Sequence, residues 1–399
     1  MKNFTVVTGV SKSHLLRTMK ILDDRGLLRV GVTSFVPKNR FFLRFFSKRI
    51  RNKFISRLEN IENLPRYSSA LTESVYQIGR SLHKRKFYRL ADFLNCCSFI
   101  LFSFLANLII SRSPNVKNEI LLVRAGFGSR IKCGNRTLVC DASLAHPLTI
   151  PTLLKEGKFG LAAKDDLGFC DQLILKDIEN ASRILVNSDF VRESFLYAGV
   201  SEEKIVVAYL PPLPTFSKKL SSAHKDKAGT LRILFAGGLE ERKGITHIRD
   251  IAEILKWRNE NFEMSLLGNW GMVTEEVKND LLANPHVKHR PWVSETELAE
   301  AMSMADIFVF PSYAEGGARV VTEAMSLGRV VITTWNSGSP ITHGFDGIIS
   351  NLDSRSFIHW IDEIQQNDEL KQSIQVNARN TITNRYSDQH YCAILEKLA

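Results

Sequence analysis

The stretch ADIFVFPSYAEGGARVVTEAMSLGRVVITTW, residues 305–335, constrains the fold more than any other part of the chain. Apart from Asp306, its first six residues form an apolar run rich in β-forming side chains, which predicts a buried strand. The segment VVTEAM predicts a helix that ends near Gly328, and VVITTW predicts the next strand. This order aims the helix N-terminus at the carboxyl edge of a parallel sheet, where open α/β folds bind ligands.

The rest of the chain repeats this alternation on both sides of one break. The break is LPPLPTFSKKLSSAHKDKAGT, residues 210–230, whose prolines, serines and scattered charges are typical of a linker. With 399 residues there is room for two domains, each with its own core. We therefore predict an α/β protein with two Rossmann-like domains whose parallel sheets face an interdomain cleft, a preferred place for ligands.

The expected domain boundaries follow from this break. We expect an N-terminal domain over 1–213 with a helical, basic insertion over about 37–118, a linker over 214–229, a C-terminal domain over 230–383, and a C-terminal helix over 384–399 that packs back on the N-terminal domain.

Composition narrows the class of protein. The six cysteines include no C-x-x-C pair and there is no His-rich cluster, which favours neither a zinc module nor a disulfide framework. The opening MKNFTVVTGVSKSH lacks the apolar core of a signal peptide, so we expect a cytoplasmic protein.

Charge is distributed unevenly along the chain. Residues 1–120 carry 22 Lys or Arg against 7 Asp or Glu, a balance of +15, whereas the net charge of the whole chain is +11. This asymmetry predicts an anionic partner for the N-terminal part alone.

Two segments of this basic part are candidates for membrane contact. Residues 37–57, PKNRFFLRFFSKRIRNKFISR, have eight basic residues, no acidic one and five phenylalanines. As a helix they could lie on an anionic membrane at its inner face; a solvated loop or a helix packed on the core fits equally. Residues 90–110 approach the length of a membrane span but contain Asp92, Asn95 and Asn107, so we expect a buried or interface-seeking helix. Nothing beyond charge and aromatics supports nucleic acid, and we expect no such partner.

The first predicted strand of the C-terminal domain ends in FAGGLEERKGI, residues 235–245. Gly237 and Gly238 allow a ligand to approach the end of the strand, and Arg242 and Lys243 offer two adjacent cations before the next helix. Backbone N–H groups and cationic side chains are a good match for a pyrophosphate. A surface turn with solvated cations fits the same short pattern, because such a motif is weak.

Two glutamates, Glu315 and Glu323, flank the start of the helix predicted near Ala318. Eight residues at helical rise span about 12 Å, roughly the length from a ribose to a sugar across a diphosphate. Glu323 could bind ribose hydroxyls, Glu315 a sugar hydroxyl, and the amides of 316–318 the phosphate or sugar. The alternative is that Glu315 only caps the helix or interacts favourably with the positive end of the helix dipole, and that Glu323 is a solvated helix residue. Arg319 opposes the helix dipole, which an anionic ligand or an ion pair with a neighbouring glutamate would relieve.

Several blocks of the C-terminal half together resemble the retaining glycosyltransferases of family 4, in group 1, which have the two-domain GT-B fold. The blocks are FAGGLEERKGI, SLLG, MADIFVFPSYAEGGARVVTEAMSLGRVVITTWNSGS and GFDGIIS. They cover most of 230–350, and weaker similarity extends through VCDASLAHP and ASRILVNSDFVRESFLYAGVSEEKIVV. Two features depart from the family: Gly238 stands where an arginine is common, and AYLPPLP replaces the usual PYGVD before the linker.

The resemblance implies a role for each candidate residue. A nucleoside-diphosphate-sugar donor would bind the C-terminal domain and a glycan or lipid-linked acceptor the N-terminal domain. Arg242 and Lys243 would neutralise the leaving diphosphate, and His146, in LAHP, would approach the sugar from across the cleft. The implied donor-binding residues are Gly237, Gly238, Arg242, Lys243, Glu315, Gly316, Gly317, Ala318 and Glu323, and the implied catalytic residues are His146, Arg242, Lys243 and Glu315.

The function implied is transfer of a glycosyl group with retention at the anomeric carbon, in cell-surface polysaccharide synthesis at the inner membrane face. No cofactor or metal is expected, because fixed cations and helix amides can stabilise charge on the diphosphate and the sequence has no Asp-x-Asp pair. Two alternatives remain open. One is a sugar-nucleotide epimerase of the same architecture, and the other is a non-catalytic membrane-peripheral subunit, which the Gly238 departure favours.

Overall fold

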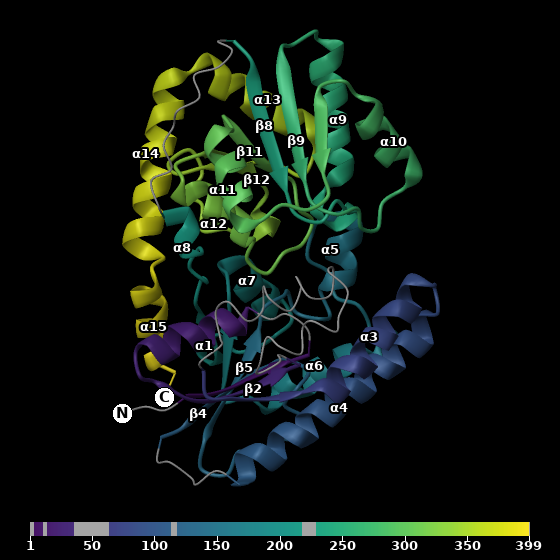
Figure 1. The fold of residues 1–399 in the computed structure, drawn as a ribbon, viewed down its shortest axis with the longest axis vertical. Helices are drawn as coiled ribbons and strands as arrows, with labels where there is room; N and C mark the ends of the chain where they lie inside the picture. Colours follow the sequence, from purple (N-terminus) through teal and green to yellow (C-terminus); the bar gives the residue numbers. More distant parts are fainter. Residues whose placement is uncertain (1–3, 11–13, 36–63, 113–117, 218–228, 399) are drawn as a thin grey trace, which may run out of the picture.

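The structure, a computed structural model, describes residues 4–10, 14–35, 64–112, 118–217 and 229–398. The basic segment 37–57 therefore lies outside the described residues, as does most of the expected linker. Two α/β domains are stacked along the long axis of the molecule, with the N-terminal domain below and the C-terminal domain above in Figure 1.

The N-terminal domain is built on a seven-stranded parallel sheet in the order β3-β2-β1-β4-β5-β6-β7. Its strands are β1 (Phe4–Gly9), β2 (Leu28–Ser34), β3 (Arg66–Ser69), β4 (Ile120–Arg124), β5 (Thr137–Ala142), β6 (Arg183–Val186) and β7 (Ile205–Val207). The central strands are nearly continuous apolar runs because helices cover both faces of the sheet. These helices are α1 (Leu15–Asp24), α3 (Ala70–Lys84), α4 (Tyr88–Arg112), α5 (Ile150–Glu156), α6 (Phe169–Asn180) and α7 (Asp189–Tyr197).

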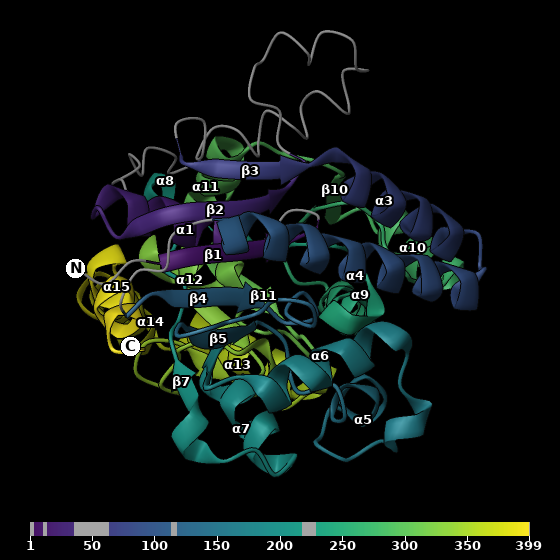
Figure 2. The same cartoon turned by 90° about the horizontal axis from the view of Figure 1, so that it is seen from below.

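The described part of the expected helical insertion is not wholly helical. After the undescribed residues the chain forms β3, which pairs in parallel with β2 as the edge strand, and only then the antiparallel pair α3 and α4 (Figure 2). The sequence Arg66–Ser69 has no apolar alternation, so pairing with β2, not its own pattern, makes this segment a strand.

The C-terminal domain has a six-stranded parallel sheet in the order β10-β9-β8-β11-β12-β13. Its strands are β8 (Leu231–Ala236), β9 (Phe262–Leu267), β10 (Val287–Arg290), β11 (Ile307–Phe310), β12 (Val330–Thr333) and β13 (Ile348–Ile349). The short helix α8 (Pro214–Ser217) lies in the connection between the domains. The helices of the C-terminal domain are α9 (Ile245–Trp257), α10 (Glu275–Ala283), α11 (Glu295–Met304), α12 (Arg319–Ser326), α13 (Ser354–Gln366) and α14 (Asp368–Arg385). The strand order reverses between β8 and β11, and a crevice at such a reversal is where open parallel sheets bind ligands.

The last helix, α15 (Asp388–Glu396), leaves the C-terminal domain and packs on the N-terminal one (Figure 1). Tyr391 is buried among the side chains of β1 and α1, and its hydroxyl lies 2.9 Å from Thr18 Oγ1. Asp388 accepts two hydrogen bonds from Arg17 at 2.8 and 2.7 Å. The chain thus crosses between the domains twice, through the connection after β7 and through α14 to α15.

Candidate functional site

The candidate site lies where the strand order of the C-terminal sheet reverses. The short 3-10 turn Glu241–Lys243 follows β8, and the loop of residues 311–318 follows β11, so both emerge from neighbouring strands at the same edge. Tyr313 N–H donates to the Arg242 carbonyl at 2.9 Å and ties the two loops together. The turn and the helix start that the sequence analysis singled out are therefore adjacent.

Gly244 makes this close approach feasible. Its φ is 75°, in the left-handed region, and a Cβ there would lie 2.0 Å from the Pro311 carbonyl oxygen. Any other residue would push the two loops apart, because both the backbone conformation and the contact exclude a side chain. Gly237 and Gly238, at the end of β8, lie beside the side chains of Lys243 and Glu240 respectively.

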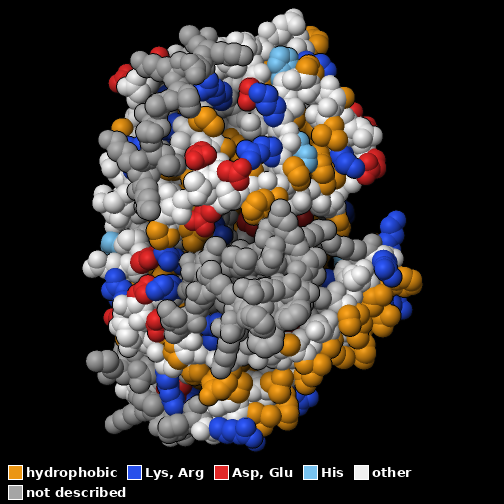
Figure 3. Space-filling view, in the orientation of Figure 1, with side chains coloured by type: hydrophobic (Ala, Val, Ile, Leu, Met, Phe, Trp, Pro, Cys, Tyr) orange, Lys and Arg blue, Asp and Glu red, His pale blue; other side chains and the backbone are white. Residues whose placement is uncertain are grey.

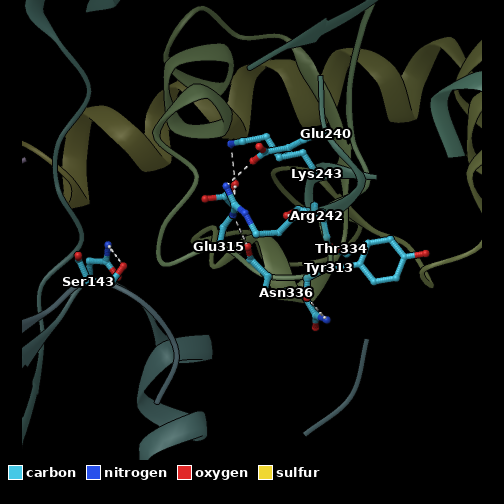
Figure 4. A network of polar contacts seen from close by, with 11 residues as sticks. Ser143, Glu240, Arg242, Lys243, Tyr313, Glu315, Thr334 and Asn336 are labelled. Carbon is cyan, nitrogen blue, oxygen red and sulfur yellow. Dashed lines mark hydrogen bonds and ion pairs between the residues drawn. The ribbon is translucent and has the colours of Figure 1, made fainter. Parts of the chain in front are cut away.

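Four charged side chains form one cluster at this point, which we call the charged cluster: Glu240, Arg242, Lys243 and Glu315 (Figure 4). Glu315 Oε1 lies 2.6 Å from Lys243 Nζ and 2.9 Å from Arg242 Nη1. Arg242 also donates to Glu240 at 2.8 Å and to the Ala314 carbonyl at 2.6 Å. The side chains of Lys243 and Glu315 are only 17% and 13% exposed, and Arg242, at 35%, is held by three contacts, so this is not a pair of freely solvated cations on a surface turn.

The second glutamate is buried within the first turns of α12. Glu323 is 2% exposed, and its Oε1 lies 3.2 Å from Nε of Arg319, one turn earlier on the helix. Of the two ways to relieve a cation at this helix start, the structure shows the ion pair with a glutamate. A carboxylate this deeply buried is not a solvated surface residue, so the alternative interpretation of Glu323 does not hold.

The backbone amides at the start of α12 divide into two groups. Glu315 N–H donates to the Asn336 carbonyl and Ala318 N–H to the Ser337 carbonyl, each at 2.9 Å. Within the described part of the chain, the amides of Gly316 and Gly317 have no hydrogen-bond acceptor. Of the three amides proposed to face the phosphate or sugar, Ala318 is thus already engaged, and Gly316 and Gly317 are the ones left to a ligand.

The loop of residues 311–318 and the turn Trp335–Ser337 both contact the N-terminal domain. Ser188 Oγ, at the start of α7, donates to the Gly316 carbonyl, and a Cβ at Gly316 would lie 1.7 Å from the Ser143 carbonyl oxygen. Asn336 Nδ2 donates to the Gly157 carbonyl at 2.7 Å, and Trp335 Nε1 to Glu193 at 2.9 Å. The charged cluster therefore lies at the interdomain boundary, with Ser143 on the facing side in Figure 4.

Sequence reasoning missed these cross-domain residues. From its sequence context, Ser188 is only a predicted N-cap of α7, and in the structure its hydroxyl does accept from Val191 N–H at 3.2 Å. Its second role, toward Gly316, joins residues 128 positions apart. Asn336 lies in a short turn after β12, inside a block that resembles the family but for which no role was predicted. No local signal could have identified either contact.

His146 is buried in the N-terminal domain. It is 3% exposed, its ring packs edge-on against Phe195 with centroids 5.0 Å apart, and Nδ1 accepts from Leu148 N–H at 3.3 Å. Burial, with a smaller contribution from the positive charge of Lys164, lowers its pKa from 6.5 to about 4. The ring is therefore neutral at pH 7, with its proton on Nε2. Its role toward a sugar stays a prediction.

This burial predicts that His146 contributes to the pH dependence of stability. Between pH 6.5 and about 4 the unfolded chain takes up a proton on this histidine and the folded chain does not, so stability falls as the pH falls through that window. Each pKa unit of such a difference corresponds to about 1.4 kcal/mol. We expect the Tm of the wild type to drop more between pH 7 and 5 than the Tm of His146→Gln. Parallel Tm curves for the two proteins would contradict this account.

Comparison with known proteins identifies a family whose model matches the part of the chain that contains the charged cluster. Residues 217–381 match the model of the family described as glycosyl transferases group 1, which confirms the resemblance at that level. A D-inositol 3-phosphate glycosyltransferase of Pseudarthrobacter chlorophenolicus is 27% identical over 204 residues, 47% of this chain and 48% of that protein. A capsular polysaccharide biosynthesis glycosyltransferase of Staphylococcus aureus is 25% identical over 181 residues, 44% and 47% of the two chains. The chain spans about half the length of the curated relatives it matches.

Solved structures resemble the whole chain. Staphylococcus aureus TarM, in complex with UDP and other ligands, superposes with a TM-score of 0.67 at 13% identity, over 100% of this chain and 99% of that one. An Anabaena protein, HepE, solved in complex with UDP, gives 0.62 at 15% identity, over 100% and 99%. At this level of identity the likeness shows the fold, and the predicted pair of parallel-sheet domains in the GT-B architecture is confirmed.

Proposed function

We propose that this chain, whose residues 217–381 match the glycosyl transferases of group 1, transfers a sugar from a nucleoside-diphosphate-sugar donor to a glycan or lipid-linked acceptor, with retention at the anomeric carbon. Such a reaction would serve cell-surface polysaccharide synthesis at the inner membrane face. The observation that carries the proposal is the meeting of Arg242 and Lys243 with Glu315 at the strand-order reversal, against the other domain.

The charged cluster is suited to exchange its partners when a donor binds. In the structure, Glu315 pairs with both Arg242 and Lys243, and Glu240 pairs with Arg242. A diphosphate would compete for the two cations, because phosphate oxygens accept the same charge-assisted hydrogen bonds. Glu315, released from Lys243, would then accept a hydrogen bond from a hydroxyl of the donor sugar.

The remaining groups fit the other parts of a donor. The amides of Gly316 and Gly317 would donate to the diphosphate or sugar at the positive end of α12. Glu323, which lies 3.2 Å from Arg319 Nε, would accept from the ribose hydroxyls. His146, with its proton on Nε2, would approach the sugar from the other domain, which requires its ring to become more accessible than in the structure.

The proposed chemistry needs no separate base. The bond from the anomeric carbon to the leaving diphosphate oxygen breaks, and the bond to the acceptor oxygen forms on the same face of the sugar. The proton of the acceptor hydroxyl passes to the leaving phosphate oxygen. Arg242 and Lys243 stabilise the charge that develops on that diphosphate, a role for which fixed cations in a partly buried site are effective. The proposal therefore includes no metal ion.

A thermal-shift panel tests the donor part of this proposal. UDP-, GDP- and ADP-sugars are added to the wild type, to Glu323→Ala and to Glu323→Gln, all in EDTA. We expect one nucleotide class to raise the Tm of the wild type by several degrees. We expect Glu323→Ala to weaken that donor at least tenfold, because a buried acceptor of the ribose hydroxyls is lost, and Glu323→Gln to weaken it less.

Two results would contradict the proposal. Equal stabilisation of the wild type and both Glu323 variants would place the nucleotide elsewhere, and stabilisation that appears only when Mg²⁺ replaces EDTA would contradict the metal-free mechanism. Release of the sugar from the donor without any acceptor, as its free epimer, would favour the epimerase alternative.

A further inference from the structure

One face of α4 carries a stripe of exposed apolar side chains, which we call the α4 stripe: Leu90, Phe93, Phe104 and Leu108. Their exposed fractions are 50%, 53%, 50% and 37%. At 3.6 residues per turn these four positions fall within one narrow arc of the helix. The buried residues of α4, such as Ser98, Phe102 and Ala106, fall on the opposite side.

The sides of α4 outside the stripe are held in the domain by polar contacts. Ser98 Oγ donates to the Thr72 carbonyl at 2.8 Å, and Ser103 Oγ accepts from Arg130 N–H at 2.8 Å. Asn107 Oδ1 accepts from Lys132 N–H at 2.9 Å. By length and composition α4 could cross a membrane, but doing so would break these bonds and leave their polar groups without partners. The helix is instead anchored along one side and apolar along the other.

Neighbouring segments extend the stripe into a wider surface. Leu71 and Ile78 of α3 are 62% and 55% exposed, and Phe87 and Tyr88, at the turn between the helices, are 59% and 54% exposed. Figure 3 shows this apolar band over α3 and α4, at the lower right, with Lys and Arg at its ends. An exposed apolar surface of this extent, on a helix pair with one side already packed, indicates a docking surface.

The helix pair carries a net positive charge. Residues 70–112 contain six Lys or Arg and two Asp or Glu. The two acids do not balance the surface, since Glu73 is 6% exposed and Asp92 accepts from Phe169 N–H at 2.7 Å. The exposed charges here include Arg80, Arg85, Lys86 and Arg89, close to the turn between the helices. An apolar face bordered by cations is complementary to a lipid surface with negatively charged headgroups.

We propose that the α3–α4 pair docks in the plane of an anionic membrane, with the α4 stripe at the boundary between headgroups and acyl chains and the basic residues among the headgroups. A second copy of the chain is a poorer occupant, because two surfaces of like charge would repel each other. This contact is separate from residues 37–57, which lie outside the described residues, and it does not depend on sugar transfer.

The location of the surface has a consequence for the acceptor side of the cleft. Phe99 of α4 lines a cavity of about 130 Å³ with Arg124, Phe127 and Asp141, at the carboxyl edge of the N-terminal sheet. Phe99 lies on the side of α4 away from the stripe, so docking through α4 would place this cavity one helix diameter, roughly 10–12 Å, from the lipid surface. This consequence, unlike the docking itself, rests on the proposed function.

Vesicle co-sedimentation of the full chain, without nucleotide, tests the docking. The test variant is Phe93→Glu/Phe104→Glu/Leu108→Glu, and the matched control is Trp257→Glu/Trp292→Glu, whose side chains are 83% and 67% exposed on the C-terminal domain. With vesicles of phosphatidylglycerol and phosphatidylcholine, we expect the triple variant to bind at least about tenfold more weakly and the control to change less than about twofold. Because all five positions are exposed, we expect every variant to keep the circular dichroism spectrum of the wild type.

The basic residues are tested separately, with Arg85→Gln/Lys86→Gln. We expect about a fivefold loss of binding for each charge removed, and no such loss with pure phosphatidylcholine vesicles. Unchanged vesicle binding by the triple variant would overturn the proposal and assign the contact to another segment. Resistance of wild-type binding to alkaline carbonate would also overturn it, in favour of a span. A wild-type dimer that the triple variant converts to a monomer, without vesicle binding by either, would identify a second copy as the occupant.

Discussion

Replacing Lys243 by alanine should lower kcat/KM for sugar transfer by about 10²–10³-fold, the usual cost of removing one preorganised group that stabilises developing charge. Its ammonium lies 2.6 Å from Glu315 and 5.2 Å from the centre of the Phe310 ring, so it is held in one place before any donor binds. Without it, Arg242 alone would face the leaving diphosphate, and Glu315 would stay paired with that arginine. We expect most of this loss in kcat/KM to appear as a lower kcat, because negative charge on the diphosphate grows as the glycosidic bond breaks.

The measurement is steady-state release of the nucleoside diphosphate with the donor that stabilises the wild type. Lys256→Ala is the matched control, because Lys256 lies on the following helix, is 45% exposed and pairs only with Glu253 among the described residues. We expect the control to keep wild-type rates and both variants to keep a Tm within a few degrees of the wild type. If Lys243→Ala turned over at the wild-type rate, the diphosphate would not bind at the turn Glu241–Lys243.

Replacing Gly316 by alanine should have the second large effect, by a purely steric route. A Cβ there would lie 1.7 Å from the carbonyl oxygen of Ser143 and 2.7 Å from its carbonyl carbon, both backbone atoms of the other domain. The backbone of Gly316 is not in the left-handed region, and the three atoms nearest to the added Cβ all belong to the other domain. The domains would have to separate locally, and a misplacement of about 1 Å can cost about 10²-fold in rate.

We therefore expect Gly316→Ala to lower kcat about 10²-fold while the affinity for the donor changes less than about threefold. Gly317→Ala is the matched control: its nearest contacts would be the Asn187 carbonyl oxygen at 3.1 Å and side-chain atoms of Asn187 at 3.5 Å. We expect the control to lose less than about tenfold in kcat. Equal kcat values for the two variants would show that the contact seen here is not part of the active arrangement.

Much of the fold could be predicted from local pattern. Runs such as IFVF of β11 and VVIT of β12 are fully buried strands, and strand-helix alternation around the break near 210–230 indicated two domains. The edge strand β3 was missed, since only its pairing with β2 defines it. For α4, composition left a choice between a buried and an interface-seeking helix, and the structure shows one buried and one exposed face.

For the candidate site, the residue types and their order along the chain determined which groups to consider, because glycines, paired cations and acids after parallel strands are brought to one sheet edge by the fold class itself. Only the tertiary structure decided that Glu323 is buried against Arg319, that the Ala318 amide is already engaged, and that Ser143 and Ser188 face Gly316. Periodicity along a chain reports which side of an element is buried, and it carries no information on how two separately folded surfaces meet. That meeting depends on close packing between atoms more than a hundred residues apart.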